Sequence, residues 1–194
     1  MNLEQQLEKI KAEHLFRQRM TRTSKAGRYV SIEGRQMLNF NSNDYLGLAN
    51  HPEVLAAASD AAGKFGFGST GSPLMSGYTS IHQELEFAMA DFLEYPRVVL
   101  FSAGYLANLG VAQTLLKRND WFVQDRLNHA SLIDAAHITG AELKRYPHLN
   151  NDKAEALLQE NITQFKLWAT EGVFSMDGDS HDLFNAALSA HTYN

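Results

Sequence analysis

A run of small residues, Ser102-Ala103-Gly104, lies between an apolar stretch and a helical pattern and could seat a phosphate group. The first turn of a helix offers unpaired backbone amides and the positive end of the helix dipole, and small residues let a phosphate approach that backbone. Tyr105 follows and could place an aromatic ring beside a heteroaromatic cofactor. The structural alternative is that Ser102 caps the helix, Gly104 makes a tight turn and Tyr105 is a core residue.

A second polar group, Asp125-Arg126-Leu127-Asn128-His129, lies between a predicted strand and a predicted helix. This is the end of a sheet at which α/β proteins bind their ligands. A neutral imidazole at His129 could stack on a pyridine ring or donate a hydrogen bond to a substrate carboxylate. A histidine at this position can equally cap the helix or lie at the surface.

A third group, residues 170–179, closes another predicted strand and contains Ser175 and the carboxylates of Glu171, Asp177 and Asp179. Acidic side chains in one segment suit acid–base chemistry or a Mg²⁺ or Ca²⁺ ion. The spacing is not that of a calcium-binding loop, and Asp177-Gly178 is also typical of a plain turn.

The elements that carry these groups predict an α/β fold. We expect strands at 97–101, 121–124, 141–145 and 165–169, and helices at 104–117, 130–138 and 152–160. This alternation predicts a parallel sheet covered by helices.

The preceding residues predict an amino-terminal arm over 1–45, with a helix over 2–22 and a hairpin that turns at Glu33-Gly34. A further helix opens at His51-Pro52 and ends near Gly63. A loop rich in Gly and Ser covers 65–82, and a helix follows over 83–93.

Composition narrows the class of protein. The 194 residues are 44% hydrophobic and 20% charged, which is typical of a globular chain. A net charge of −5, with the 17 Lys and Arg scattered, argues against a nucleic-acid partner. The absence of cysteine excludes disulfides and thiol chemistry. No apolar run suggests a membrane span and the polar start is unlike a signal peptide, so we expect a cytoplasmic protein.

Five motifs together resemble one enzyme family, the α-oxoamine synthases. They are residues 41–48, 66–82, 102–105, 125–131 and 170–179. Within that family, Ser72-Pro73-Leu74 ahead of Ser76-Gly77-Tyr78, together with Asp125-Arg126-Leu127-Asn128-His129, is most similar to the 8-amino-7-oxononanoate synthases. The resemblance covers residues 1 to about 183, which correspond to about the first half of the family's length.

The resemblance implies a fold-type I enzyme dependent on pyridoxal 5′-phosphate (PLP), with a three-layer α/β/α sheet and a homodimeric assembly. Residues 46–194 would be an incomplete large domain. The reaction would be the decarboxylative condensation of L-alanine with pimeloyl-CoA or a pimeloyl carrier protein, in biotin synthesis. No metal, membrane or nucleic acid is implied. By matching motif positions, the cofactor would be bound by Gly104, Tyr105, His129 and Ser175, and the substrate by Arg17, Asn43 and His129.

The family's Schiff-base lysine and the aspartate that pairs with the pyridinium nitrogen lie in motifs that these residues do not contain. The eight lysines, at 9, 11, 25, 64, 117, 144, 153 and 166, stand in other contexts. We therefore expect a truncated chain that has no catalytic lysine and is inactive alone. Half of a sheet would also leave an open strand edge and an unburied face, so we expect the chain to be poorly soluble or dependent on a partner. Two alternatives stay open: a glycine C-acetyltransferase (2-amino-3-ketobutyrate CoA ligase) and a non-catalytic binding fragment.

Overall fold

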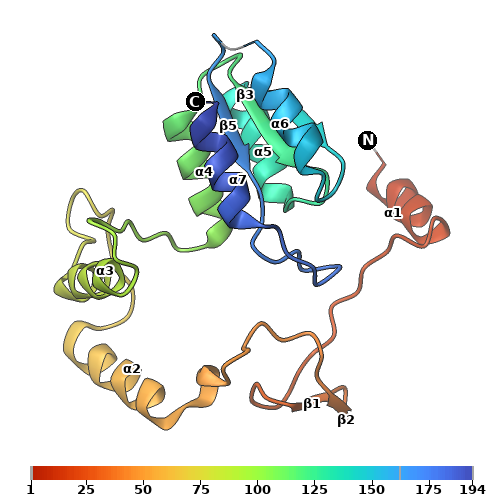
Figure 1. The fold of residues 1–194 in the computed structure, drawn as a ribbon. Coiled ribbons are helices and arrows are strands. Elements are labelled where there is room, and N and C mark those ends of the chain that lie inside the picture. Colours follow the sequence, from red (N-terminus) through yellow and green to blue (C-terminus); the bar gives the residue numbers. More distant parts are fainter. Residues whose placement is uncertain (1, 162, 194) are drawn as a thin grey trace. The chain divides into compact units, whose positions relative to one another are not determined.

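The computed structural model describes residues 2–161 and 163–193. The chain divides into two compact units, residues 1–77 and residues 78–194 (Figure 1). The predicted division into an arm over 1–45 and a large domain over 46–194 stays a prediction. Among the described residues, none of the helices combines the length and the apolar character that crossing a membrane requires.

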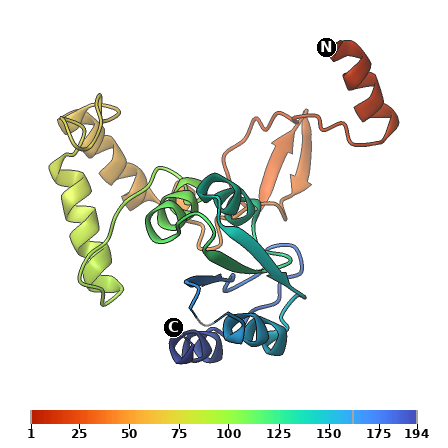
Figure 2. The same ribbon diagram turned by 90° about the horizontal axis from the view of Figure 1, so that it is seen from above.

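The first unit contains a helix, a hairpin and a second helix. Its elements are α1 (Leu3–Ala12), β1 (Tyr29–Ile32), β2 (Arg35–Leu38), the 3₁₀ helix η1 (Leu48–Asn50) and α2 (Pro52–Phe65). The antiparallel pair β1–β2 is visible in Figure 2. Its two-residue turn has positive φ at Glu33 (49°) and Gly34 (78°), the backbone that a tight hairpin favours, so the predicted hairpin is confirmed.

The predicted helix over 2–22 is wrong in length, because α1 ends at Ala12. His14 takes the left-handed conformation with φ of 56°. The amide of Leu15 then donates to the carbonyl of Ile10 over 2.9 Å, and that of His14 donates to Lys11 over 3.1 Å. This pair of bonds closes helix ends and usually involves glycine. The histidine in that place gave no stop signal in the sequence.

The second unit is a three-layer α/β/α sandwich, as predicted. Three parallel strands lie in the order β4 (Glu142–Tyr146), β3 (Trp121–Asp125), β5 (Lys166–Ala169). Helices α4 (Gly104–Leu115) and α5 (Ala130–Thr139) cover one face, α6 (Asn151–Gln159) covers the other, and α7 (Leu183–Thr192) packs beside α6 (Figure 1). Helix α3 (Ser80–Phe92) precedes this sandwich in the chain.

The core lies on both faces of the central strand. Phe122 packs with α4 and α5, and Val123 packs with α6 and with Tyr146 of β4. All five residues of β3 are buried, which is expected for a parallel strand covered on both sides. The carboxyl ends of the three strands therefore meet at one edge, where the predicted polar groups follow.

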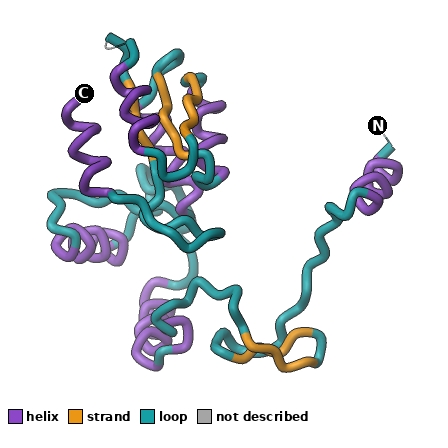
Figure 3. The backbone as a smooth tube through the Cα atoms, turned by 45° about the vertical axis from the view of Figure 1, so that its right-hand side comes forward, coloured by secondary structure: helices purple, strands orange, loops and turns teal. Residues whose placement is uncertain are grey.

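The predicted strand at 97–101 is wrong. These residues form part of the loop between α3 and α4 (Figure 3), and Val99 is 73% exposed. A strand exists through its hydrogen-bonded neighbour, and no strand among the described residues pairs with this segment.

Other differences concern element ends. Helix α3 begins at Ser80, three residues earlier than expected, because Thr79 and His82 form a reciprocal capping box. Helix α2 continues past Gly63 to Phe65 and ends at Gly66, where φ is 75°. Helix α7, whose amino terminus is capped by Asp182, was not predicted.

Candidate functional site

A cavity of about 300 Å³ lies at the carboxyl ends of β3 and β5. Residues 127–130, which follow β3, and residues 171–177, which follow β5, provide its walls. The lining side chains are those of Leu127, Asn128, His129, Ala130, Glu171, Phe174, Ser175, Met176 and Asp177. Two of the three polar groups selected from the sequence thus meet at one cavity, at the edge of the sheet where α/β folds bind ligands.

A chain of hydrogen bonds orients His129 at the start of α5. The imidazole Nδ1 accepts from the amide of Ser131 over 3.2 Å and lies 2.7 Å from its hydroxyl. Asn108 of α4 donates to that hydroxyl oxygen over 2.9 Å, which leaves the hydroxyl hydrogen free to point at Nδ1. A neutral His129 with an accepting Nδ1 carries its proton on Nε2. Its side chain is exposed and available to a ligand.

The residue before His129 ties the cavity wall to β5. Asn128 donates from Nδ2 to the carbonyl of Ala169 over 2.7 Å, and the amide of His129 donates to the Glu171 carboxylate. The Oδ1 atom of Asn128 is buried and has no hydrogen-bond partner among the described residues. The amide nitrogen of Asn128 therefore fixes this cavity wall to β5.

Gly104 and Tyr105 begin α4. The N-cap is Ala103 and not Ser102, and a Cβ built on Gly104 would meet no atom within 4 Å. The Tyr105 ring lies 6.2 Å from the His129 ring, edge to face. Its hydroxyl donates to the Asp134 carboxylate, and this hydrogen bond is the largest cause of the raised pKa of Tyr105. Tyr105 is thus a fixed, protonated neighbour of His129.

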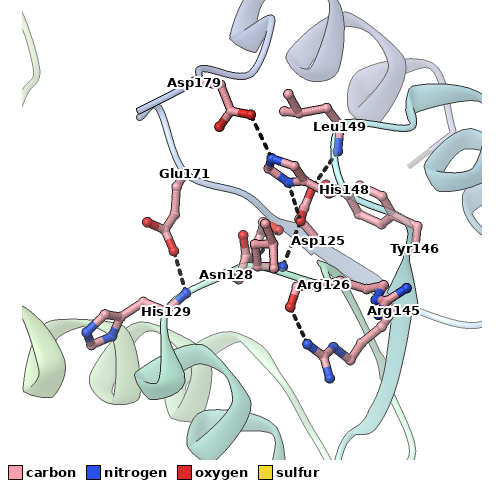
Figure 4. A network of polar contacts seen from close by, with 12 residues as sticks. Asp125, Arg126, Asn128, His129, Arg145, Tyr146, His148, Leu149, Glu171 and Asp179 are labelled. Carbon is pink, nitrogen blue, oxygen red and sulfur yellow. Dashed lines mark hydrogen bonds and ion pairs between the residues drawn. The ribbon is translucent and has the colours of Figure 1, made fainter. Parts of the chain in front are cut away.

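A second histidine, His148, follows β4 and links the end of β3 to the loop beyond β5 (Figure 4). Its Nδ1 lies 2.9 Å from Asp125 Oδ1 and its Nε2 lies 2.9 Å from Asp179 Oδ2. The Asp125 carboxylate also accepts the amides of Leu127 and Leu149, each over 2.8 Å. Asp125 is therefore committed to the fold and not to a ligand.

The structure brings together four of the predicted site residues in the second unit. Tyr105 contacts His129, Gly104 directly precedes Tyr105, and Ser175 lines the same cavity as His129. Arg17 and Asn43 belong to the first unit, where the hydroxyl of Tyr45 donates to Asn43 Oδ1 over 3.4 Å. The roles assigned to all six residues stay predictions.

Sequence reasoning did not select His148, Ser131 or Asn108. His148 follows the end of β4 as His129 follows the end of β3, so position in the chain could have indicated it. None of the side chains that line the cavity is a lysine. Among residues 2–161 and 163–193, no three His, Asp or Glu side chains are grouped as a metal site requires.

The aminotransferase class I and II family matches residues 35–184. The chain is 47% identical over 173 residues to an 8-amino-7-oxononanoate synthase of Salmonella newport (strain SL254), a match that covers 89% of this chain and 45% of that protein. It spans about half the length of the curated relatives it matches.

Solved structures agree with this relationship. A serine palmitoyltransferase variant from S. paucimobilis with a bound PLP–myriocin aldimine matches with a TM-score of 0.87 and 28% identity, over 99% of this chain and 49% of that one. An 8-amino-7-oxononanoate synthase from Francisella tularensis matches with a TM-score of 0.67 and 32% identity, over 77% of this chain and 41% of that one.

Proposed function

Since the chain belongs to the aminotransferase class I and II family and is homologous to 8-amino-7-oxononanoate synthases, we propose that it forms the amino-terminal half of such a synthase. The whole enzyme would condense L-alanine with a pimeloyl thioester, on CoA or on a carrier protein, and release CO₂ and the thiol carrier. The observation that carries this proposal is the meeting of His129 and Ser175 at one cavity, beside the start of α4. We further propose a cytoplasmic homodimer, following the family.

The family uses PLP, and the residues at the cavity fit that group. Space is open around Gly104, so a phosphate can approach the first turn of α4, where helix amides are unpaired. The pyridine ring of PLP would meet the imidazole of His129, and its phosphate would meet the backbone amides at the start of α4. Its phenolic oxygen would meet the hydroxyl of Ser175.

Each residue would then have a distinct task. Gly104 and Tyr105 would hold the phosphate at the start of α4, and His129 would present its ring to the pyridine, oriented by Ser131. Ser175 would donate a hydrogen bond to the phenolic oxygen. Arg17 and Asn43 would contact the substrate. PLP, when bound, supplies the electron sink that stabilises a carbanion at the α-carbon of the amino acid.

Because no lysine lines the cavity, we propose that these 194 residues by themselves bind PLP reversibly and turn over no substrate. The test is to add PLP to the purified chain, treat it with borohydride and locate any fixed label by mass spectrometry. We expect a saturable change in absorbance with no stable label on any one of the eight lysines. A stoichiometric label on a single lysine would overturn this part of the proposal.

A product assay tests the substrate class. A full-length synthase that contains residues 1–194 should release free CoA from alanine and pimeloyl-CoA, and much less from glycine and acetyl-CoA. The reverse preference would replace the proposed function with that of a glycine C-acetyltransferase. Activity with neither pair, in a full-length protein that binds PLP, would contradict both.

A further inference from the structure

His148 lies where three separate segments converge. Asp125 is the last residue of β3, His148 follows β4 and Asp179 lies beyond β5 (Figure 4). The two ring nitrogens of His148 each lie 2.9 Å from a carboxylate oxygen. The Asp125 side chain is fully buried and that of His148 is 24% exposed. The contact is thus largely protected from water on one side and open enough on the other to exchange protons.

Asp179 belongs to the same loop as the cavity wall. The amide of Phe174 donates to the carbonyl of Asp179 over 2.9 Å, and the amide of Gly178 donates to the carbonyl of Phe174 over 2.8 Å. The loop over 174–179 is therefore a closed turn, and its residues Phe174, Ser175, Met176 and Asp177 line the cavity. The ring of His148 also meets the buried Phe174 ring edge to face, with centroids 4.5 Å apart. His148 contacts this loop at both of its ends.

The charge state of His148 follows from its partners. An ionised carboxylate only accepts hydrogen bonds, so both ring nitrogens must carry a proton for both contacts to be hydrogen bonds. The hydrogen bond to Asp125, followed by that to Asp179, raises the pKa of His148 above its usual value. Near this pair lies Tyr146 of β4, whose pKa is raised above all by burial and further by the Asp125 carboxylate.

We propose that His148, as an imidazolium, is a positioning residue that holds the loop over 174–179 against the end of β3 and so places Ser175 in the cavity. Loss of its proton removes one of the two hydrogen bonds and loosens the loop. Because the pKa is raised in the folded chain, this contribution is complete below the ordinary imidazole pKa and is lost as the pH rises through the raised value. The consequence for PLP rests on the proposed function.

The first test measures the loop without any ligand. Hydrogen exchange at the amides of Phe174 and Gly178, corrected for intrinsic rates, is compared between the unsubstituted chain, His148→Gln and the control His137→Gln, an exposed histidine of α5. We expect protection in the unsubstituted chain to fall roughly tenfold across the titration of His148 followed by NMR, as for one lost charge-assisted hydrogen bond. Protection in His148→Gln should be low and independent of pH, and protection in His137→Gln should change with pH as it does in the unsubstituted chain. Equal protection in His148→Gln would overturn the proposal.

The second test measures binding of PLP itself by equilibrium dialysis over the same pH range. The dissociation constant should rise with pH in the unsubstituted chain and in His137→Gln. In His148→Gln it should already be higher at low pH and should change less with pH. Ionisation of the PLP phosphate is common to all three and cancels in the comparison. Equal constants in His148→Gln and the unsubstituted chain would overturn the link to Ser175. If no chain binds PLP at any pH, the proposed function fails, and the exchange measurement still decides the role of His148.

Discussion

His129 is oriented by two polar side chains, those of Ser131 and Asn108. Ser131 is fully buried, and its hydroxyl stands between the Asn108 amide and the His129 ring. A buried hydroxyl that both accepts and donates fixes the rotamers on either side of it. The orientation of His129 is therefore a property of α4 and α5 packed together, and it exists before any ligand is bound.

Replacing Ser131 by alanine tests this arrangement. Ser131→Ala removes both hydrogen bonds and leaves the Asn108 amide without its acceptor, so the free energy of unfolding should fall by about 1–2 kcal/mol. Urea denaturation measures the change. Ser59→Ala, on an exposed face of α2, is the matched control and should be neutral or slightly stabilising because alanine favours helices. Equal effects of the two substitutions would contradict the assigned role.

Asp125 makes a second residue-scale prediction. Its carboxylate accepts three hydrogen bonds with no exposed surface, so Asp125→Asn should lower the free energy of unfolding by about 2–4 kcal/mol, since an amide nitrogen would face donors. Thermal and urea unfolding should both report the loss. Asp152→Asn, in the exposed first turn of α6, should change the stability by less than about 0.5 kcal/mol. A mild effect at Asp125 would mean that its carboxylate is free for a ligand after all.

The sequence predicted that polar residues gather at the carboxyl edge of the sheet. It did not predict which of them face the cavity and which are hydrogen-bonded within the fold. Asp125 ends β3 and His129 follows it, and only the structure shows that Asp125 is bound by the backbone of two loops while His129 lines the cavity. That difference depends on whether the amides of Leu127 and Leu149 reach the Asp125 carboxylate. The two amides belong to two different loops, so both loops must fold correctly for the contacts to form. A single sequence contains no signal for such a meeting.

At the scale of elements, the start of α4 is the part of the site most sensitive to side-chain bulk. Gly104→Ala should leave the stability unchanged or raise it by up to about 1 kcal/mol, because open space surrounds the position and alanine favours helices. The same methyl group would stand where a phosphate approaches the amides. Binding of PLP should weaken roughly tenfold or more, the value of a hydrogen bond to a charged group.

Gly63→Ala is the matched control for this helix start. Gly63 also lies in a helix with open space around it, and it is remote in sequence from the predicted phosphate seat. The substitution should stabilise α2 by a similar amount and leave the PLP dissociation constant unchanged, as measured by equilibrium dialysis. If Gly104→Ala and Gly63→Ala bind PLP equally, α4 does not seat the phosphate.

Elements were predictable where the local pattern and the packing agree. β3, β4 and β5 alternate with α4, α5 and α6 as expected, because each strand is short and residues of all three helices pack against the sheet. The failures have local physical causes. His14 ends α1 in a conformation that usually belongs to glycine, and residues 97–101 have a strand-like composition with no strand to pair with among the described residues. Composition predicts propensity, whereas a strand also needs a partner.

At the scale of the whole molecule, exposed apolar side chains and unpaired strand edges are the features that call for an explanation. Three large side chains in the Gly- and Ser-rich loop are almost fully exposed, Phe67 at 91%, Leu74 at 96% and Met75 at 86%. In the second unit, β4 and β5 each have an edge without a neighbour among the described strands. Exposed apolar side chains and open strand edges both favour association with another chain.

We therefore predict that the chain self-associates and that the loop contributes to the contact. Sedimentation velocity over a hundredfold range of concentration should show the mean mass rising with concentration. The triple substitution Phe67→Ser, Leu74→Ser and Met75→Ser should shift that rise to a roughly tenfold higher concentration, since each buried apolar side chain contributes about 1.5–3 kcal/mol and only part of that is recovered on association. The control Leu3→Ser, Leu15→Ser and Met20→Ser removes three exposed apolar side chains from the amino-terminal 20 residues and should leave the profile unchanged. A monomer at every concentration would contradict the prediction and show that the loop is stable in water while exposed. If the two triple substitutions have equal effects, association depends on exposed apolar side chains in general and not on this loop.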